Sequence, residues 1–254
     1  MEKVRLGGMA LANGVLVHGP TAWGCAVRLP DGRIKVASGR KRRMVPRVQA
    51  PFLRGPLRLA EAFAVLPEVR RRLPQARFPF ERPIVLASVV ASSATVAAIR
   101  RSRLSVGARE LVAGIASLTP AVLALRGGEL AGYHGAEHVS IGTYEQGERA
   151  PKEHERCGSH LVGPLLFTSA VANVLAAKSP LRARTPARIA GALGAVGASV
   201  EIFAWMTRNP DHPVARALAR PGYELQHRLS TAEPAPEQLE VAEAALAACL
   251  ELEE

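Results

Sequence analysis

Four apolar stretches restrict the possible folds of this 254-residue chain more than any other feature of its sequence. They comprise residues 84–99, 111–125, 161–177 and 189–207. The first and third contain no charged side chain, and the last contains a single carboxylate, Glu201. A helix needs about 20 apolar residues to cross a bilayer, with roughly 17 as the lower limit. The four stretches lie near this limit, and together they predict a mainly α-helical, membrane-associated bundle.

Basic side chains flank the apolar stretches, at positions where the cations of membrane helices reach the headgroups. They are Arg82, Arg100, Arg101, Arg103, Lys178, Arg182, Arg184 and Arg188. The mean hydropathy of the whole chain is only +0.08, which also suits a soluble bundle of buried, alanine-rich helices. The soluble bundle is therefore the alternative interpretation.

The sequence allows two arrangements of the helical bundle relative to the membrane. Residues 1–8 contain neither an apolar run nor a cleavage site, which predicts a mature, cytoplasmic N-terminus. Four full crossings would place the basic N-terminal part opposite the basic links at 100–103 and 178–188, against the positive-inside rule. Re-entrant or interfacial helix pairs would keep every basic segment on one side, so charge alone leaves both arrangements open.

The excess positive charge lies in the first third of the chain. Residues 1–83 hold 17 Lys and Arg against 5 Asp and Glu, and the whole chain has a net charge of +11. The densest clusters, at 40–43 and 70–72, suit a solvated surface, anionic lipid headgroups or nucleic acid. Aromatic residues make up 4% of the chain and do not cluster among the arginines, so no base-stacking surface and no nucleic acid are expected. Anionic lipid headgroups are the predicted partner.

The first 83 residues are predicted to form a small β-rich domain. Trp23, Cys25 and Val27 occupy alternate positions, the turn sequence Pro-Asp-Gly follows at 30–32, and alternation resumes at Ile34. This pattern predicts a β-hairpin. An amphipathic helix from Pro56 to Leu66, which Pro67 would end, and a proline-rich linker would then lead to the second domain.

The second domain, residues 84–254, is predicted to be helical and membrane-associated. It contains a polar, histidine-rich segment at 126–160 and an amphipathic C-terminal helix that begins near Pro236. The fold class is thus α+β, with the β-rich part first.

The pattern H-x-x-E-H occurs at His134, Glu137 and His138. On a helix these three side chains share one face, which suits two metal ligands beside a general base. The same residue order is the inverzincin signature, in which the glutamate deprotonates a zinc-bound water. The pattern therefore predicts a site for Zn²⁺ or another divalent metal, with Glu137 as the catalytic base, although a capping or surface pair of histidines is the alternative.

Three further residues could supply the remaining metal ligand. His154 and Cys157 form an H-x-x-C pattern, which is weak by itself. Glu201 is costly to bury alone in an apolar stretch, so it is expected either at the metal or paired with Arg109. The chain has three cysteines, an odd number, and they lie far apart in the sequence. This predicts no disulfide framework.

Several motifs occur in the order found in the YqhQ-like bacterial membrane proteins. They are G-G-M-A at 7–10, N-G-V at 13–15, Y-H-G-A-E-H at 133–138, H-E-R-C-G at 154–158 and L-S-T-A-E-P at 229–234. The chain resembles this family over almost its whole length. The resemblance implies a bacterial inner-membrane location and a metal-dependent enzyme, without a substrate. The family usually has an acidic residue where Asn13 stands, which puts activity in doubt, and His160 is outside its pattern.

Three functions follow from these features. The first is a membrane-associated, metal-dependent hydrolase with ligands from His134, His138 and one of Glu201, His154 or Cys157. The second is a membrane scaffold whose His/Cys cluster holds a structural ion and whose basic N-terminal part docks on lipid or a partner. The third, a soluble nucleic-acid-binding protein, lacks the aromatic surface that it would need.

Overall fold

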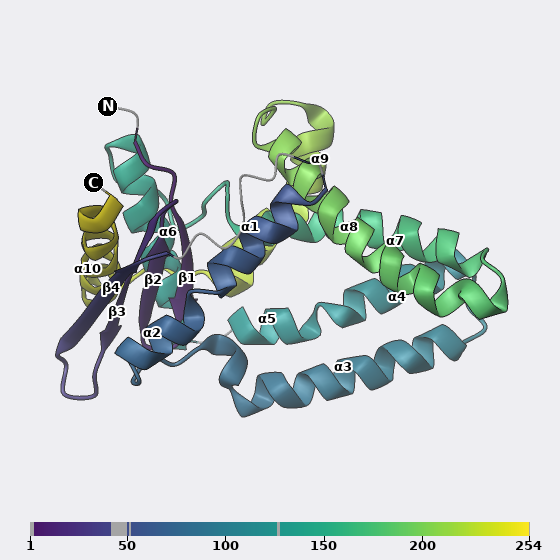
Figure 1. Ribbon diagram of the computed structural model, residues 1–254, viewed down its shortest axis with the longest axis horizontal. Helices are drawn as coiled ribbons and strands as arrows, with labels where there is room; N and C mark the ends of the chain where they lie inside the picture. The colour runs from purple at the N-terminus through teal and green to yellow at the C-terminus, as the bar shows by residue number, and fades with distance from the viewer. Residues whose placement is uncertain (1–2, 42–49, 51, 126–127, 254) are drawn as a thin grey trace.

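The structure is a computed structural model that describes residues 3–41, 50, 52–125 and 128–253. It begins with a four-stranded antiparallel sheet whose strands follow one another in chain order (Figure 1). The strands are β1 (Gly7–Leu11), β2 (Gly14–His18), β3 (Ala22–Arg28) and β4 (Ile34–Arg40). The predicted hairpin is confirmed, because Arg28 pairs with Ile34 across the turn. Gly32 in this turn has a φ of 84°, a left-handed conformation that glycine adopts without steric cost.

The helices follow the sheet. They are α1 (Arg54–Phe63), α2 (Leu66–Arg72), α3 (Pro83–Arg101), α4 (Val106–Ser117), α5 (Thr119–Leu125), α6 (Gly128–Gln146), α7 (Val162–Ala177), α8 (Arg184–Met206), α9 (Pro213–Leu225) and α10 (Pro236–Glu253), with the short helical turns η1 (Pro79–Glu81), η2 (Gly158–Leu161), η3 (Leu181–Ala183) and η4 (Gln226–Ser230). The expectation that a helix ends at Pro67 was wrong. Pro67 lies in the first turn of α2, where a helix needs no backbone N–H.

The sheet is covered on both faces. Trp23, Cys25 and Val27 of β3 are fully buried and pack against α2 and the segment after it. The opposite face packs against α6 and α10 (Figure 1). A Cβ atom at Gly24 would lie 2.3 Å from the carbonyl oxygen of Ala245 in α10. The glycine therefore allows a helix from the C-terminal end of the chain to lie directly on a strand from the N-terminal end.

Two antiparallel helical hairpins, α3 with α4 and α7 with α8, project together from the sheet (Figure 1). Four helical stretches are long and apolar enough to cross a membrane: Pro83–Arg101, Val106–Ala124, Gly158–Ala177 and Arg184–Met206. At most 22% of the most apolar window of each stretch is buried. Helices that expose most of their apolar side chains do not fit the soluble bundle, in which these side chains would form the core.

The α+β fold class is confirmed, whereas the domain division at residue 83 stays a prediction. Contacts cross that boundary, because Arg28 of β3 forms an ion pair with Glu240 of α10 at 2.7 Å. The basic cluster at 70–72 is partly neutralised by ion pairs of Arg70 with Glu81 and of Arg72 with Glu68. Arg42 and Arg43 of the other basic cluster lie outside the described residues.

Candidate metal centre

Helix α6 carries both histidines of the H-x-x-E-H pattern and is buried along most of its length. His134 and His138 lie one turn apart, with ring centroids separated by 4.4 Å. Gly135 weakens helix α6 intrinsically, and the packing around it explains why a glycine stands there. A Cβ atom there would lie 2.0 Å from the carbonyl oxygen of Ala232, so the glycine lets the chain after η4 approach the histidine face.

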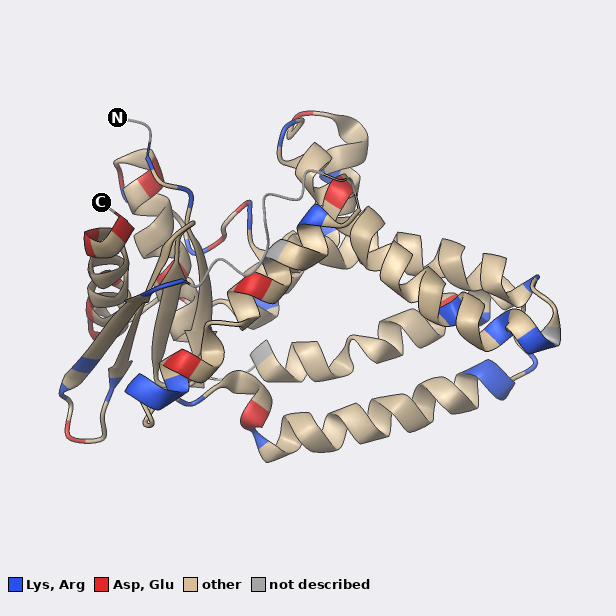
Figure 2. Ribbon diagram, viewed as in Figure 1, with Lys and Arg blue, Asp and Glu red and all other residues tan. Residues whose placement is uncertain are grey.

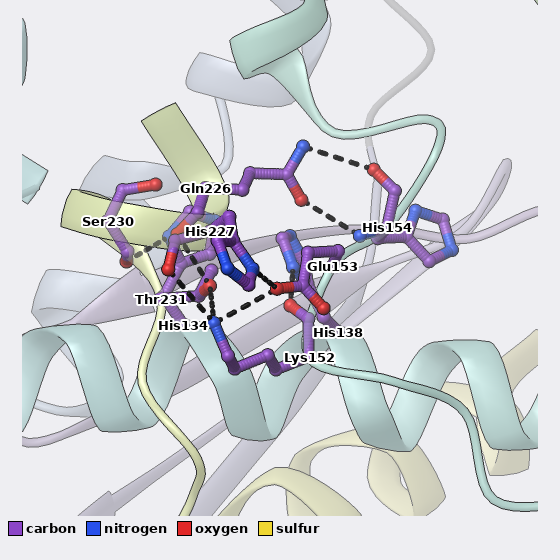
Figure 3. A network of polar contacts seen from close by, with 9 residues as sticks. All are labelled: His134, His138, Lys152, Glu153, His154, Gln226, His227, Ser230 and Thr231. Carbon is purple, nitrogen blue, oxygen red and sulfur yellow. Dashed lines mark hydrogen bonds and ion pairs between the residues drawn. The ribbon is translucent and has the colours of Figure 1, made fainter. Parts of the chain in front are cut away.

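Hydrogen bonds fix the tautomer of both histidines (Figure 3). The Nδ1 of His134 lies 2.8 Å from the carbonyl oxygen of Ser230, and the Nδ1 of His138 lies 2.6 Å from the carbonyl oxygen of Lys152. A carbonyl oxygen can only accept, so each Nδ1 carries the proton and each Nε2 has a free lone pair. Metal-binding histidines are commonly oriented in this way.

Cys157 completes the cluster. Its Sγ lies 3.6 Å from the Nε2 of His134, and one ligand atom from each of Cys157, His134 and His138 lies within 4.8 Å of the others. Metal–ligand bonds of about 2.0–2.3 Å at tetrahedral angles place ligand atoms about 3.5 Å apart. The cluster therefore fits a tetrahedral ion after a small contraction.

Burial controls the charge of these groups. It lowers the pKa of His138 well below its ordinary value and raises the pKa of the Cys157 thiol. Both side chains are thus neutral near pH 7, and a bound cation would displace the thiol proton.

Glu137 lies beside the cluster in a fully buried position. Burial raises the pKa of its carboxyl group to about 7, while the nearby His134 acts in the opposite direction. A Cβ atom at Gly8 of β1 would lie 2.4 Å from Oε1 of Glu137. The glycine pair at the start of the sheet thus has a physical reason, because strand β1 lies against the carboxylate.

The segment that carries Cys157 is held by Gln226, which is fully buried at the start of η4. Its Oε1 accepts from the backbone N–H of His154 at 2.8 Å, and its Nε2 donates to Ser159 Oγ at 2.7 Å. The turn η4 is a π-helix, a conformation often found at functional sites. Sequence reasoning missed Gln226, and it missed the two anchoring carbonyls, although the motif at 229–234 contains Ser230.

The Lys152 carbonyl that anchors His138 belongs to a further network (Figure 3). The ammonium group of Lys152 donates to the carbonyl oxygen of His227 at 3.2 Å and pairs with Glu153 at 3.0 Å. Glu153 also contacts the Nδ1 of His227 at 2.8 Å. The loop after α6 is therefore tied to η4 on both sides of the histidine pair.

The structure does not bring the other predicted ligands into the cluster. Glu201 lies on α8, and its two carboxylate oxygens bind the guanidinium group of Arg54, with Nε 2.8 Å from Oε1. Its partner is thus neither the metal cluster nor Arg109, the two alternatives that the sequence left open. The Nε2 of His154 lies 3.3 Å from Glu145, and its ring centroid is 5.6 Å from that of His138.

Two residues set aside by the family pattern have structural partners. His160 is buried, and its Nε2 lies 3.0 Å from Nε2 of Gln226. Asn13 lies in the turn between β1 and β2, where its Oδ1 accepts from the backbone N–H of Arg77 at 3.0 Å. Asn13 therefore connects the sheet to the segment after α2, and none of its hydrogen bonds within the described residues reaches the His/Cys cluster.

Comparison with known proteins finds similarity in the C-terminal half of the chain. Residues 129–252 match the family described as "Protein of unknown function (DUF1385)". The chain is 34% identical over 118 residues to the "Uncharacterized protein YqhQ" of Bacillus subtilis (strain 168). The matched part of the chain therefore resembles YqhQ. The aligned part covers 43% of this chain and 37% of the relative's length. No solved structure matches the chain.

The YqhQ-like family model covers the elements that build the cluster. Its residues include α6, the segment with Cys157, η4 and α10. Strand β1, which lies against Glu137, is outside the matched region. Both the likeness to YqhQ and the family description leave the chemistry to be argued from the site itself.

Proposed function

We propose that this chain is a membrane-associated, metal-dependent hydrolase whose ion is held by His134, His138 and Cys157. One observation carries the proposal: backbone carbonyls bind the Nδ1 of both histidines, and one ring nitrogen of each histidine lies within 4.8 Å of the Cys157 Sγ. Two imidazoles and a thiolate suit Zn²⁺, which accepts both ligand types. The predicted ligands Glu201 and His154 are left out of the set because they contact Arg54 and Glu145.

The same cluster could serve a structural ion in a membrane scaffold. A structural zinc site is closed by four protein ligands, whereas a catalytic site has three and an open position. The cluster found among the described residues has three members. Glu137, which lies beside His134, is a suitable acceptor for the proton of a water molecule at the open position. These two features favour the hydrolase.

The chain's own residues define the proposed steps. A bound divalent ion would supply Lewis acidity to a water molecule. Glu137 would accept a proton from that water and later donate it to the leaving group. We place the centre at the bacterial inner membrane with a cytoplasmic N-terminus. The family resemblance and the apolar hairpins support the membrane location.

Metal analysis of the detergent-purified full chain tests the ligand set. We expect about one zinc per chain in the wild type, loss of zinc in His134→Ala and Cys157→Ala, and retention in Glu137→Gln. Glu201→Gln is the matched control, because sequence reasoning named Glu201 as a ligand and the structure does not. Loss of zinc in Glu201→Gln, or none in a folded wild type, would contradict the proposed site.

Activity separates the hydrolase from the scaffold. The probe is a chromogenic acyl ester in mixed micelles, supplied to zinc-loaded wild type and Glu137→Gln. Hydrolysis by the wild type that is lost in Glu137→Gln supports the catalytic role. Equal rates in both proteins, at equal zinc content, would identify the ion as structural.

A further inference from the structure

The free ends of the two apolar hairpins carry a concentration of cations at the end of the molecule farthest from the sheet (Figure 2). The cations are Arg100, Arg101, Arg103, Arg109, Lys178, Arg182, Arg184 and Arg188. Within residues 83–125 and 157–200, Glu110 is the one carboxylate in the sequence, and it pairs with Arg100 at 3.5 Å. The hairpin tips therefore form a strongly cationic surface beside apolar helices.

An apolar groove of about 400 Å³ runs between α7 and α8 and ends at this surface. Its sides include Phe167, Val171 and Leu175, whose side chains are 45–61% exposed. Gly194 lies in the groove, and a Cβ atom there would meet nothing within 4 Å. From Phe167 to Ser179 the groove follows α7 for about 18 Å at 1.5 Å per residue. That length is close to half of the ~30 Å hydrocarbon core, the depth that one acyl chain occupies.

An unsatisfied donor lies where the groove meets the cations. The Nε of Arg188 is buried and has no hydrogen-bond partner among the described residues. Arg188 follows Ala187, which lines the groove, and Lys178 precedes Ser179 at the other side of the same end. A buried guanidinium nitrogen without a partner is costly. An anionic group beside the guanidinium would offset part of this cost electrostatically.

We propose that the α7–α8 hairpin binds one anionic phospholipid, with an acyl chain in the groove and the phosphate at Lys178 and Arg188. Basic pockets between membrane helices bind anionic headgroups in this way. A second copy of the chain is the competing occupant of an apolar groove. A symmetric dimer across this groove would bring two cationic tips together, and that repulsion favours the lipid.

The lipid site also constrains the position of the hairpin tips. A cationic tip that stopped within the hydrocarbon would be costly, so the tips lie at headgroup level. This inference is independent of the metal centre, which lies at the other end of α7.

Native mass spectrometry of the detergent-purified full chain tests the site. The probes are phosphatidylglycerol and phosphatidylcholine with identical acyl chains. We expect the wild type to retain phosphatidylglycerol preferentially, and the double variant Lys178→Gln/Arg188→Gln to weaken that binding about fivefold for each cation removed. Arg216→Gln, which changes an exposed arginine of α9, is the control and should bind both lipids as the wild type does.

A second pair of variants tests the groove. Gly194→Leu should fill it without a backbone clash and lower the retention of phosphatidylglycerol. Gly107→Leu on α4 is the matched control, because a Cβ atom at Gly107 also meets nothing within 4 Å. Equal binding of the two lipids by the wild type would overturn the proposal. Unchanged lipid binding in Gly194→Leu would also overturn it. If Gly194→Leu in addition converted dimers to monomers, the groove would be assigned to a second copy of the chain.

Discussion

Replacement of Gln226 by leucine tests how the cluster is held, because it leaves all three proposed ligands in place. The side chain is fully buried and bridges the backbone of His154 to Ser159 and His160, on either side of Cys157. In Gln226→Leu the partly buried N–H of His154 loses its acceptor, at a cost of about 1–3 kcal/mol. The contacts to Ser159 and His160 contribute about 1 kcal/mol each. Opening of the segment around Cys157 should therefore become easier by about 3–5 kcal/mol.

Zinc competition with a chromogenic chelator measures the consequence. Loss of a residue that orients metal ligands typically lowers affinity about 10–100-fold, and we expect Gln226→Leu to fall in this range. Alkylation of Cys157 in the metal-free protein gives a second readout, since the thiol should react faster when the segment opens. Cys25 and Cys249 are buried in the sheet and α10, so they contribute little to this reaction.

The matched control is Gln238→Leu at the start of α10. Gln238 accepts a hydrogen bond from the backbone N–H of Ala235 at 3.0 Å and does not touch the segment that carries Cys157. This variant should lose some stability but keep the zinc affinity of the wild type. If Gln226→Leu keeps that affinity within about twofold and Cys157 reacts no faster, Gln226 does not position the thiol, and the reasoning is refuted.

Three other predictions concern the fold. Gly24→Ala should lower the free energy of unfolding in a urea titration by about 1–3 kcal/mol or more, because its Cβ would collide with the backbone at Ala245. Burial and the nearby Lys41 lower the pKa of His18 from 6.5 to about 4, so only the unfolded chain takes up this proton between those values. Stability should fall as the pH decreases from 6.5 to about 4, by up to about 3 kcal/mol, and the titration curve of His18→Gln should lack this loss. Arg54→Gln should lower the thermal-unfolding midpoint only slightly, because its ion pair with Glu201 is partly exposed.

The local elements could be predicted from sequence because each has its own periodicity or length. Alternation around Cys25 indicated the hairpin, and the uncharged runs indicated the apolar helices. The packing of α10 on the sheet could not be predicted in this way. It depends on a contact between Gly24 and Ala245, residues far apart in the chain whose proximity no local pattern encodes. The basic links also could not show that the hairpin tips lie together, because that follows from the contact between α4 and α7.

The same distinction applies within the candidate site. His134 and His138 share a helix face because helical geometry alone brings residues four apart together, so their pairing follows from the sequence. The sequence predicted a partner for Glu201 but could not determine which basic residue it is. Tertiary packing places Arg54 beside it. Cys157 lies on a loop whose backbone at His154 is hydrogen-bonded to Gln226 in a distant turn. Ligands on one helix can thus be predicted from spacing, whereas a ligand on a loop depends on the buried polar residue that holds the loop in place.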